Sequence, residues 1–277
     1  MRIGSHVSIR EGYLGAAKQA NQLQASVYQY FPKNPRSLDV KTWNKDDAAC
    51  CKRYCVEHDM QSVSHTPYPT NLTAPEDKRE KVIQSLLNDL EISEACGSIG
   101  AVVHFGKVVD KDNPIESYQH IIKTLNQTLD QWDGSCKILL ENNAGGTFGT
   151  TIEELVQVRK LCHQSERIGF CLDTCHAFAS GVWNGDNWKE IERNDVAQDF
   201  FDHLACVHFN NSKYPPGQGK DRHANILETG HITKTQWDAF IHSPYLIDVP
   251  FILETPDENL SHEEEIERIK LEWGIFT

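Results

Sequence analysis

The chain has 277 residues, of which 39% are hydrophobic and 24% charged, and its formal net charge at pH 7 is −13. This balance is typical of a folded soluble protein and excludes a disordered chain, and no apolar run reaches the roughly 18 residues of a membrane helix. The acidic charge argues against binding nucleic acid through an evenly basic surface. An odd number of scattered cysteines and an opening sequence unlike a signal peptide favour a reducing compartment, so we expect an intracellular, cytoplasmic protein.

Apolar runs bounded by turn residues recur regularly and predict eight strands. In chain order these are 2–7, 26–31, 61–65, 101–105, 137–141, 168–173, 205–209 and 250–254. Helices are predicted over 78–95, from its apolar spacing, and over 150–162, which opens with threonines followed by acids that suit a helix N-terminus.

The alternation of strands and helices predicts a parallel sheet, and eight such units predict a closed (β/α)8 TIM barrel, an α/β fold. No composition shift or linker divides the chain, so we expect one domain over residues 1–277. After the seventh strand we expect a long loop in place of a helix. The cluster Cys50, Cys51 and Cys55 has the spacing of one helix turn and is interpreted as helix packing.

Six of the eight predicted strands have, at their last or next-to-last position, a side chain that binds metal ions. These six residues are His65, His104, Glu141, Asp173, His208 and Glu254. The carboxyl ends of barrel strands converge on one face, where active sites lie. One buried histidine is usually explained by packing, and an unpaired buried carboxylate is costly, so six together favour a shared metal site.

Three more candidate ligands lie just beyond the strands: His176, three residues after Asp173, and the pair Asp221 and His223. In an extended segment alternate side chains point the same way, so Asp221 and His223 can bind one ion. Zinc, manganese and iron accept such a set of imidazoles and carboxylates, whereas calcium and magnesium prefer oxygen alone. Nine ligands exceed the need of one tetrahedral ion and predict a metal cluster.

Several motifs spread over nearly the whole chain carry a resemblance to a known family. They read GSHVS, FPKNPR, SHTPYPTNL, VVHFG, LLENNAGG, CLDTCHAFASG, HFNNSK, DRHANI and FILETP. In these motifs the chain resembles the endonuclease IV family of AP endonucleases. The resemblance implies a barrel with three zinc ions, with manganese or iron(II) accepted at one site. It also implies a monomer that acts in base excision repair on double-stranded DNA, cutting 5′ to an abasic site and leaving a 3′-hydroxyl and a 5′-deoxyribose phosphate.

The resemblance also implies a role for individual residues. One zinc ion would be held by His65, His104 and Glu141, a second by Glu141, Asp173, His208 and Glu254, and a third by His176, Asp221 and His223. We expect Glu141 and Glu254 to assist proton transfer.

The expected DNA contacts are loop residues. The resemblance places Arg36 and Tyr68 in the DNA at the lesion, Asn34 and Asn71 nearby, and His6 beside the metal site. Without it, Arg36 would be interpreted as a solvated turn residue and Tyr68 as a side chain capping a strand.

Bound ions and a basic rim would offset the acidic charge. Three divalent ions would bring the net charge to about −7. The rim is expected to comprise Lys33, Arg36, Lys107, Lys213, Lys220 and Arg222, of which Lys220 and Arg222 are assigned to DNA. We therefore expect binding that weakens steeply with salt.

Five positions depart from the usual pattern of the family. Asn211 stands where aspartate is usual, and we expect it beside the metal ligands with an altered hydrogen bond. Gly219 replaces a basic residue, Leu227 and Thr229 replace glycines, and Pro69 replaces a bulky aliphatic side chain. These changes affect the fit to DNA and leave the nine ligands intact.

Two other functions are compatible with these features. A metal-dependent sugar isomerase or epimerase uses the same barrel, but generally needs one or two ions, and the set His176, Asp221 and His223 favours phosphodiester cleavage. A catalytically silent protein that binds abasic DNA is the second alternative, and the complete ligand set argues against it.

Overall fold

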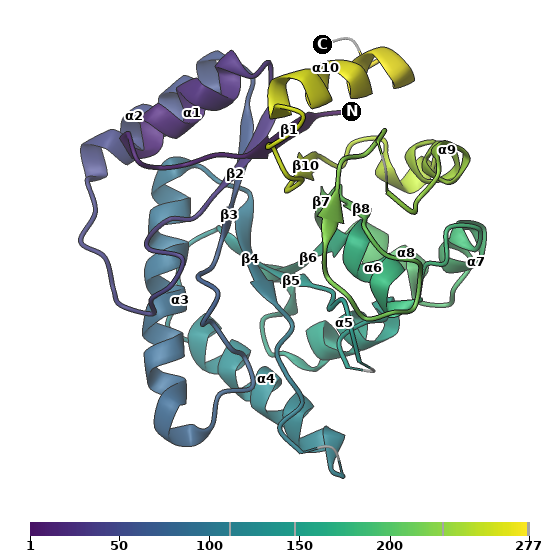
Figure 1. Cartoon of the computed structure of the whole chain (residues 1–277). Coiled ribbons are helices and arrows are strands. Elements are labelled where there is room, and N and C mark those ends of the chain that lie inside the picture. Colours follow the sequence, from purple (N-terminus) through teal and green to yellow (C-terminus); the bar gives the residue numbers. More distant parts are fainter. Residues whose placement is uncertain (111, 147, 229, 276–277) are drawn as a thin grey trace.

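Eight parallel strands close into a barrel in the computed structural model, which describes residues 1–110, 112–146, 148–228 and 230–275. The strands are β1 (Ile3–His6), β2 (Val27–Tyr30), β3 (Gln61–His65), β4 (Gly100–His104), β5 (Lys137–Glu141), β6 (Ile168–Asp173), β7 (Leu204–His208) and β10 (Phe251–Leu253). Each strand pairs with its neighbours in the order β1-β10-β7-β6-β5-β4-β3-β2, and β1 closes the barrel by pairing with both β2 and β10 (Figure 1). The predicted (β/α)8 TIM barrel is confirmed.

Helices surround this barrel on its outer side (Figure 1). They are α1 (Gly12–Gln22), α2 (Lys45–Glu57), α3 (Glu76–Cys96), α4 (Pro114–Leu129), α5 (Ile152–Leu161), α6 (Thr174–Ser180), α7 (Trp188–Glu192), α8 (Ala197–Asp202), α9 (Lys234–Ile241) and α10 (His262–Trp273), with 3-10 turns η1 (Ser165–Arg167) and η2 (Pro244–Leu246). Among the described helices, none combines the length and apolar character that a membrane crossing requires.

The predicted elements agree closely with the observed ones. Three strands, β3, β5 and β6, have the predicted bounds, and the predicted helices correspond to α3 and α5. Thr151 caps α5 together with Glu154 in a reciprocal capping box, as the threonine and acid pattern predicts. In α2, Cys51 and Cys55 are buried as free thiols against the Tyr28 hydroxyl, which confirms the helix-packing interpretation for these two, whereas Cys50 is half-buried.

The long connection after β7 has a structure that the sequence did not predict. It contains two short antiparallel strands, β8 (Asn211–Ser212) and β9 (His223–Ala224), before α9 begins at Lys234. This hairpin brings residues 221–223 back over the end of the barrel.

The barrel interior is built in layers that position the functional site. One fully buried apolar layer comprises Val27, Val63, Val102, Leu139, Cys171, Cys206 and Ile252. Because alternate residues of a strand point to the same side, the residues two positions later also face the interior. These are Gln29, His65, His104, Glu141, Asp173, His208 and Glu254. A layer of polar and ionisable side chains therefore lies directly above the apolar layer, at the carboxyl ends of the strands.

Candidate metal centre

The structure brings all nine predicted ligands together at the carboxyl end of the barrel. They form three groups, within each of which the ligand atoms lie within 4.8 Å of one another: His65, His104 and Glu141; Glu141, Asp173, His208 and Glu254; and His176, Asp221 and His223. Asp173 and His223 also meet this limit together with Cys175. The three groups are the sets expected from the sequence, and Glu141 belongs to two of them. Their role as metal ligands remains a prediction.

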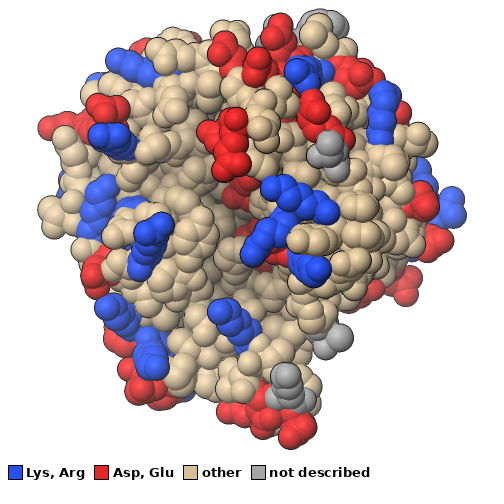
Figure 2. Space-filling view, viewed as in Figure 1, with Lys and Arg blue, Asp and Glu red and all other residues tan. Residues whose placement is uncertain are grey.

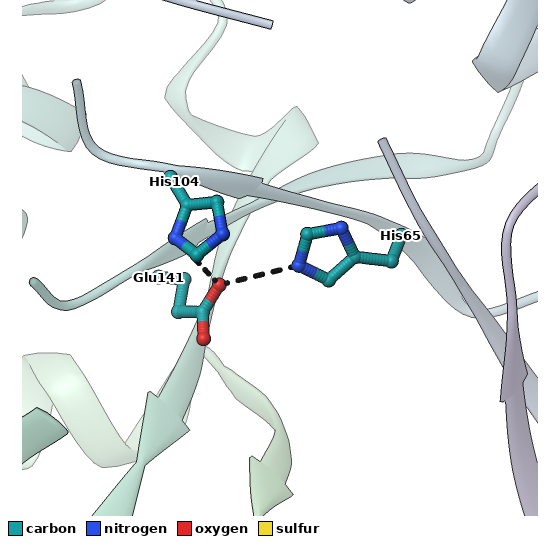
Figure 3. A group of neighbouring side chains, drawn as sticks. All are labelled: His65, His104 and Glu141. Atoms are coloured by element: carbon teal, nitrogen blue, oxygen red, sulfur yellow. Dashed lines mark ion pairs between the residues drawn. The ribbon is translucent and has the colours of Figure 1, made fainter. Parts of the chain in front are cut away.

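Glu141 is the centre of the first group. Its Oε2 atom lies 3.5 Å from Nε2 of His65 and 3.3 Å from Nδ1 of His104, and both imidazoles point toward this carboxylate (Figure 3). Glu141 is only 1% exposed. Burial alone would raise its pKa, but His104 and His208 hold the pKa well below its ordinary value. The carboxylate is therefore anionic in spite of its burial.

The second group crowds three carboxylates around one imidazole. The Nδ1 atom of His208 lies 2.9 Å from Oε1 of Glu141, 3.3 Å from Oε2 of Glu254 and 3.9 Å from Oδ2 of Asp173. Burial raises the pKa of Asp173. Burial would lower the pKa of His208, but Glu254 and Glu141 raise it to about 10. So much negative charge in a buried space attracts cations.

The third group combines the β8–β9 connection with the start of α6. Asp221 places its two carboxylate oxygens 3.3 Å from Nε2 of His176 and 3.0 Å from Nε2 of His223. Asp173 caps α6, because its Oδ1 accepts a hydrogen bond of 2.7 Å from the backbone N–H of His176. One turn of chain thus supplies side chains to two neighbouring groups.

Three of the histidines are oriented by backbone carbonyls. In each case the ring donates a hydrogen bond from Nδ1–H to a carbonyl oxygen, and Nε2 is left facing the carboxylates. The acceptors are Thr66 O for His65 at 2.7 Å, Asn142 O for His176 at 2.9 Å and Glu254 O for His223 at 3.1 Å. Such hydrogen bonds fix the tautomer and the ring orientation of metal-binding histidines.

Two asparagines that the sequence reasoning did not select hold the carboxylates in place. Asn210 donates from Nδ2 to Oδ2 of Asp173 at 2.8 Å and accepts from the backbone N–H of Glu254 at 2.9 Å. Asn142 accepts from the backbone N–H of Asp173 at 2.8 Å. Asn142 directly follows Glu141 in the motif LLENNAGG, and Asn210 follows His208 by two residues in HFNNSK. This closeness to a strand-end ligand is the feature of the sequence that could have identified both asparagines.

These residues fit a group of divalent cations. Within the described chain, the ion-pair partners of Glu141, Asp173 and Glu254 are all histidines. Two buried atoms, Glu141 Oε2 and His223 Nε2, have no hydrogen-bond partner among the described residues. Buried polar atoms are normally satisfied, so unpartnered ones within a cluster of imidazoles and carboxylates fit a role in holding a cation. Zinc, manganese and iron accept mixed imidazole and carboxylate donors.

Members of all three groups line a cavity of about 380 Å³ whose walls also include His6, Phe31 and Tyr68, while Asp173 and His208 are not part of its lining. A second cavity of about 660 Å³ shares Tyr68 and His104 with it. The face drawn in Figure 2 is hollowed near its centre, with Lys and Arg side chains on both sides of the hollow and acidic side chains in it.

Tyr68 stands at the mouth of the metal pocket. Its side chain is 64% exposed, and its ring packs against Phe31 at 5.2 Å between centroids. Its backbone N–H donates to Pro35 O at 2.9 Å, which joins the loops after β2 and β3. Exposed Arg36 therefore lies on a loop tied directly to the segment that carries Tyr68.

The two expected asparagine contacts lie in the same loops. Asn34 is exposed, and its Oδ1 accepts from the backbone N–H of Arg36 at 3.0 Å. Asn71 is half-buried, lines the second cavity and accepts from the Thr73 hydroxyl at 2.8 Å.

The expected basic rim is correct in part. Lys107, Lys213, Lys220 and Arg222 are exposed, and Nζ of Lys220 lies 4.2 Å from the centroid of the Tyr214 ring. The prediction that Lys33 belongs to the exposed rim is wrong, because Lys33 is 3% exposed and its Nζ lies 3.2 Å from Oδ1 of buried Asp89. The motif FPKNPR does not reveal that α3 passes behind this loop and supplies the partner.

His6 lies beside the metal groups as expected. It lines the metal pocket, its Nδ1 is 3.2 Å from Nε2 of Gln29, and its ring packs 4.7 Å from Phe31 between centroids. Burial lowers the pKa of His6 to about 4, so it is neutral at physiological pH.

Asn211 has a different place from the one expected. Its side chain bonds to backbone groups of Ser212, Ile226 and Ile232, and none of the hydrogen bonds found in the described chain joins it to a predicted metal ligand. Two of these bonds run from the amide Nδ2 to carbonyls, which an aspartate could not form. Asn211 thus braces the altered loop after β9, and Gly230 leaves room for it, since a Cβ there would lie 2.0 Å from Asn211 Cγ.

The other departures lie at the edges of the site. Leu227 packs against the hydrophobic core, Pro69 lines the second cavity, and Gly219 has a φ of +63°, which a basic side chain would adopt with strain. Thr229 lies outside the described residues.

Comparison with known proteins identifies relatives along nearly the whole chain. The family model described as "Xylose isomerase-like TIM barrel" matches residues 14–273. A protein of Symbiobacterium thermophilum named probable endonuclease 4 is 39% identical over 261 residues, covering 92% of this chain and 93% of the relative. The crystal structure of endonuclease IV from Thermus thermophilus superposes with a TM-score of 0.83 at 28% identity, covering 99% of this chain and 98% of that one.

The barrel itself is shared more widely. The crystal structure of a D-tagatose 3-epimerase-like protein superposes with a TM-score of 0.70 at 18% identity, covering 99% of this chain and 98% of that one. At that identity the likeness shows the fold alone, so the barrel does not separate a nuclease from a sugar epimerase.

Proposed function

The chain belongs to the endonuclease IV family of AP endonucleases, and we propose that it is a zinc-dependent enzyme of base excision repair. It hydrolyses the phosphodiester 5′ to an abasic site in double-stranded DNA and leaves a 3′-hydroxyl and a 5′-deoxyribose phosphate. The observation that carries this proposal is the convergence of nine imidazole and carboxylate side chains in three neighbouring groups, two of which share Glu141. We propose three zinc ions, with manganese or iron(II) accepted at one position, and a monomeric enzyme.

Bound divalent ions supply charge stabilisation to the attacking and leaving oxygens of a phosphodiester. The chain's own residues orient that chemistry. Glu141 and Glu254 are the candidate proton carriers, since both lie in the pocket wall and Glu141 joins two ligand groups. Burial would raise the pKa of Glu254, but His208 helps to lower it to about 2, so this carboxylate is anionic at neutral pH and suited to holding a cation.

The surface around the pocket supports binding of a damaged duplex. We propose that Arg36 and Tyr68 enter the DNA at the lesion, that Asn34 and Asn71 contact the strand nearby, and that exposed Lys220 and Arg222 contact phosphates. Tyr68 suits this role because its aromatic ring is exposed on a segment stiffened by Pro67 and Pro69. Its position at the pocket mouth allows the ring to fill the space left by a displaced nucleotide.

The two other functions have less support. A sugar epimerase would share the barrel, but that function does not explain the third ligand group of His176, Asp221 and His223 or the exposed cations that flank the pocket. A silent DNA-binding protein would be expected to have lost ligands, whereas here each of the three ligand groups is complete and its ligand atoms lie within 4.8 Å of one another.

Incision of a defined substrate tests the proposal. A duplex with one abasic site and a label on the damaged strand is incubated with zinc-loaded protein, and the fragment is tested as a primer for a DNA polymerase. A single cut on the 5′ side and an extendable 3′-hydroxyl are expected. An intact duplex, together with turnover of ketoses, would contradict the proposal and favour the epimerase.

A further inference from the structure

One buried amide lies inside the metal centre and belongs to none of the three ligand groups. Gln29 is the interior residue of β2 in the layer that contains the predicted ligands, and it is fully buried. Its Oε1 lies 2.7 Å from Nε2 of His208, and its Nε2 lies 2.6 Å from Oε1 of Glu254 and 3.2 Å from Nδ1 of His6. A single side chain thus contacts two predicted ligands and the histidine beside them.

The chemistry of the neighbours fixes the orientation of this amide. The Glu254 carboxylate can only accept, so the group next to it must be the NH₂ of Gln29. The carbonyl oxygen of Gln29 then faces His208, where it can only accept a hydrogen bond. His208 must therefore carry a hydrogen on Nε2. Neutral His6 accepts the second N–H of the amide, and all three polar contacts of Gln29 are satisfied.

The consequence for His208 is a fixed choice of metal-binding atom. With Nε2–H engaged by Gln29, Nδ1 is the nitrogen that gives up its proton when a cation binds, so the metal-binding lone pair lies there. That atom faces Glu141, Glu254 and Asp173 in the second ligand group. His65, His176 and His223 are oriented in the opposite sense, through Nδ1–H and a backbone carbonyl. Since a backbone carbonyl is present whatever the sequence, His208 differs from these three in depending on a side chain.

We propose that Gln29 is a positioning residue that sets the tautomer of His208 and the orientation of Glu254, and so makes the second metal position bind tightly. This inference rests on the metal centre of the proposed function. Groups that orient metal ligands typically change metal affinity by roughly 10- to 100-fold when they are removed. Removal of Gln29 is expected to weaken one zinc equivalent by that factor and to leave the other two close to their original affinity.

Two variants and a matched control separate this role from general packing. Gln29→Leu removes all three hydrogen bonds of the amide. Gln29→Glu keeps an acceptor for His208 but places a carboxylate against Glu254. Gln61→Leu is the control, because Gln61 begins β3 next to Val27, at the opposite end of the barrel from the metal groups. The variants are prepared as zinc-loaded proteins and titrated with a chelator, and the zinc retained per chain is measured by mass spectrometry.

Gln29→Leu should release one zinc equivalent at a chelator concentration roughly 10- to 100-fold lower than the parent requires, with Gln29→Glu between the two. Gln61→Leu should match the parent. Cobalt-loaded protein adds a structural signature, because the Nε2–H of His208 should give a shifted NMR signal protected from exchange, and Gln29→Leu should lose that protection. Circular dichroism of the chelator-treated variants checks that the barrel is intact.

Zinc retention by both Gln29 variants equal to that of the parent would overturn the inference. So would an unchanged His208 signal in the cobalt-loaded Gln29→Leu protein. The measurements count metal ions and do not use DNA. A parent that binds zinc but fails to cut abasic DNA would contradict the proposed function alone, while the effect of Gln29 on zinc would still be decided by the titration.

Discussion

A buried ion pair anchors the loop that carries Arg36, and the substitution Asp89→Asn tests what holds this pair together. Lys33, in that loop, donates from Nζ to the backbone oxygen of Ser85 at 2.6 Å and lies 3.2 Å from Oδ1 of Asp89 in α3. Burial lowers the pKa of Lys33 and raises that of Asp89 to about 7. Both shifts oppose ionisation, so the cost of removing these charges from water exceeds their attraction.

The size of the expected change in stability with pH follows from the pKa values of Asp89 in the unfolded and folded states. Its ordinary value is 3.8, so the folded state raises the pKa by about 3 units, equivalent to about 4 kcal/mol. The pKa of Asp89 is higher in the folded state than in the unfolded state, so protonation of this carboxyl group stabilises the fold. The stabilisation is complete below pH 4 and is lost as the pH rises through 7. Between pH 5.5 and 8.5 the loss amounts to about 2 kcal/mol.

The assay is urea unfolding of zinc-loaded parent and Asp89→Asn proteins at several pH values between 5.5 and 8.5. The asparagine side chain has nearly the same shape but does not titrate, so subtraction removes the contributions of all other groups. The parent is expected to lose about 2 kcal/mol relative to the variant over this range. A parent that gains stability relative to the variant as the pH rises would refute the reasoning, because it would show that pairing with Lys33 outweighs burial.

Three further substitutions test the surface and the support of the site. Arg36→Ala should weaken binding to abasic DNA and reduce the dependence of log K on log salt by about 1, measured by fluorescence anisotropy; an unchanged slope would exclude a phosphate contact. Tyr68→Ala should cost about 1–3 kcal/mol of DNA affinity through lost stacking, whereas Tyr68→Phe should bind like the parent. Glu265→Gln should destabilise the protein by about 2 kcal/mol in urea unfolding, because this buried carboxylate accepts from Ile226 N and the Thr255 hydroxyl.

The barrel and its polar layer were predictable because both depend on local pattern. Apolar runs marked the strands, and the residue that ended each run, such as Glu141 or Asp173, stood out against its neighbours. The period of two in a strand then brought these side chains to one interior layer. Once eight units closed into a barrel, proximity of the strand-end ligands followed from topology.

Contacts between distant segments were not predictable in the same way. Lys33 looked like a rim cation because its partner Asp89 comes 56 residues later, on a helix whose buried face includes polar residues. Gln29 lies in the middle of a predicted strand, and nothing local distinguishes it from a side chain that faces outward. Asn211 was expected near the ligands because of its place in the motif, but the β8–β9 hairpin turns its side chain toward residues 226 and 232.

The most direct test of the metal centre is incision of an abasic duplex by the parent and by Glu141→Ala, with zinc counted in each protein. Glu166→Ala is the matched control, because Glu166 is exposed in η1, before β6 and away from the ligands. The parent and the control should each bind three zinc ions and cut 5′ to the lesion. Glu141→Ala should lose zinc and all measurable incision, since Glu141 joins two of the ligand groups. A Glu141→Ala protein that keeps its zinc and cuts as fast as the parent would contradict the account.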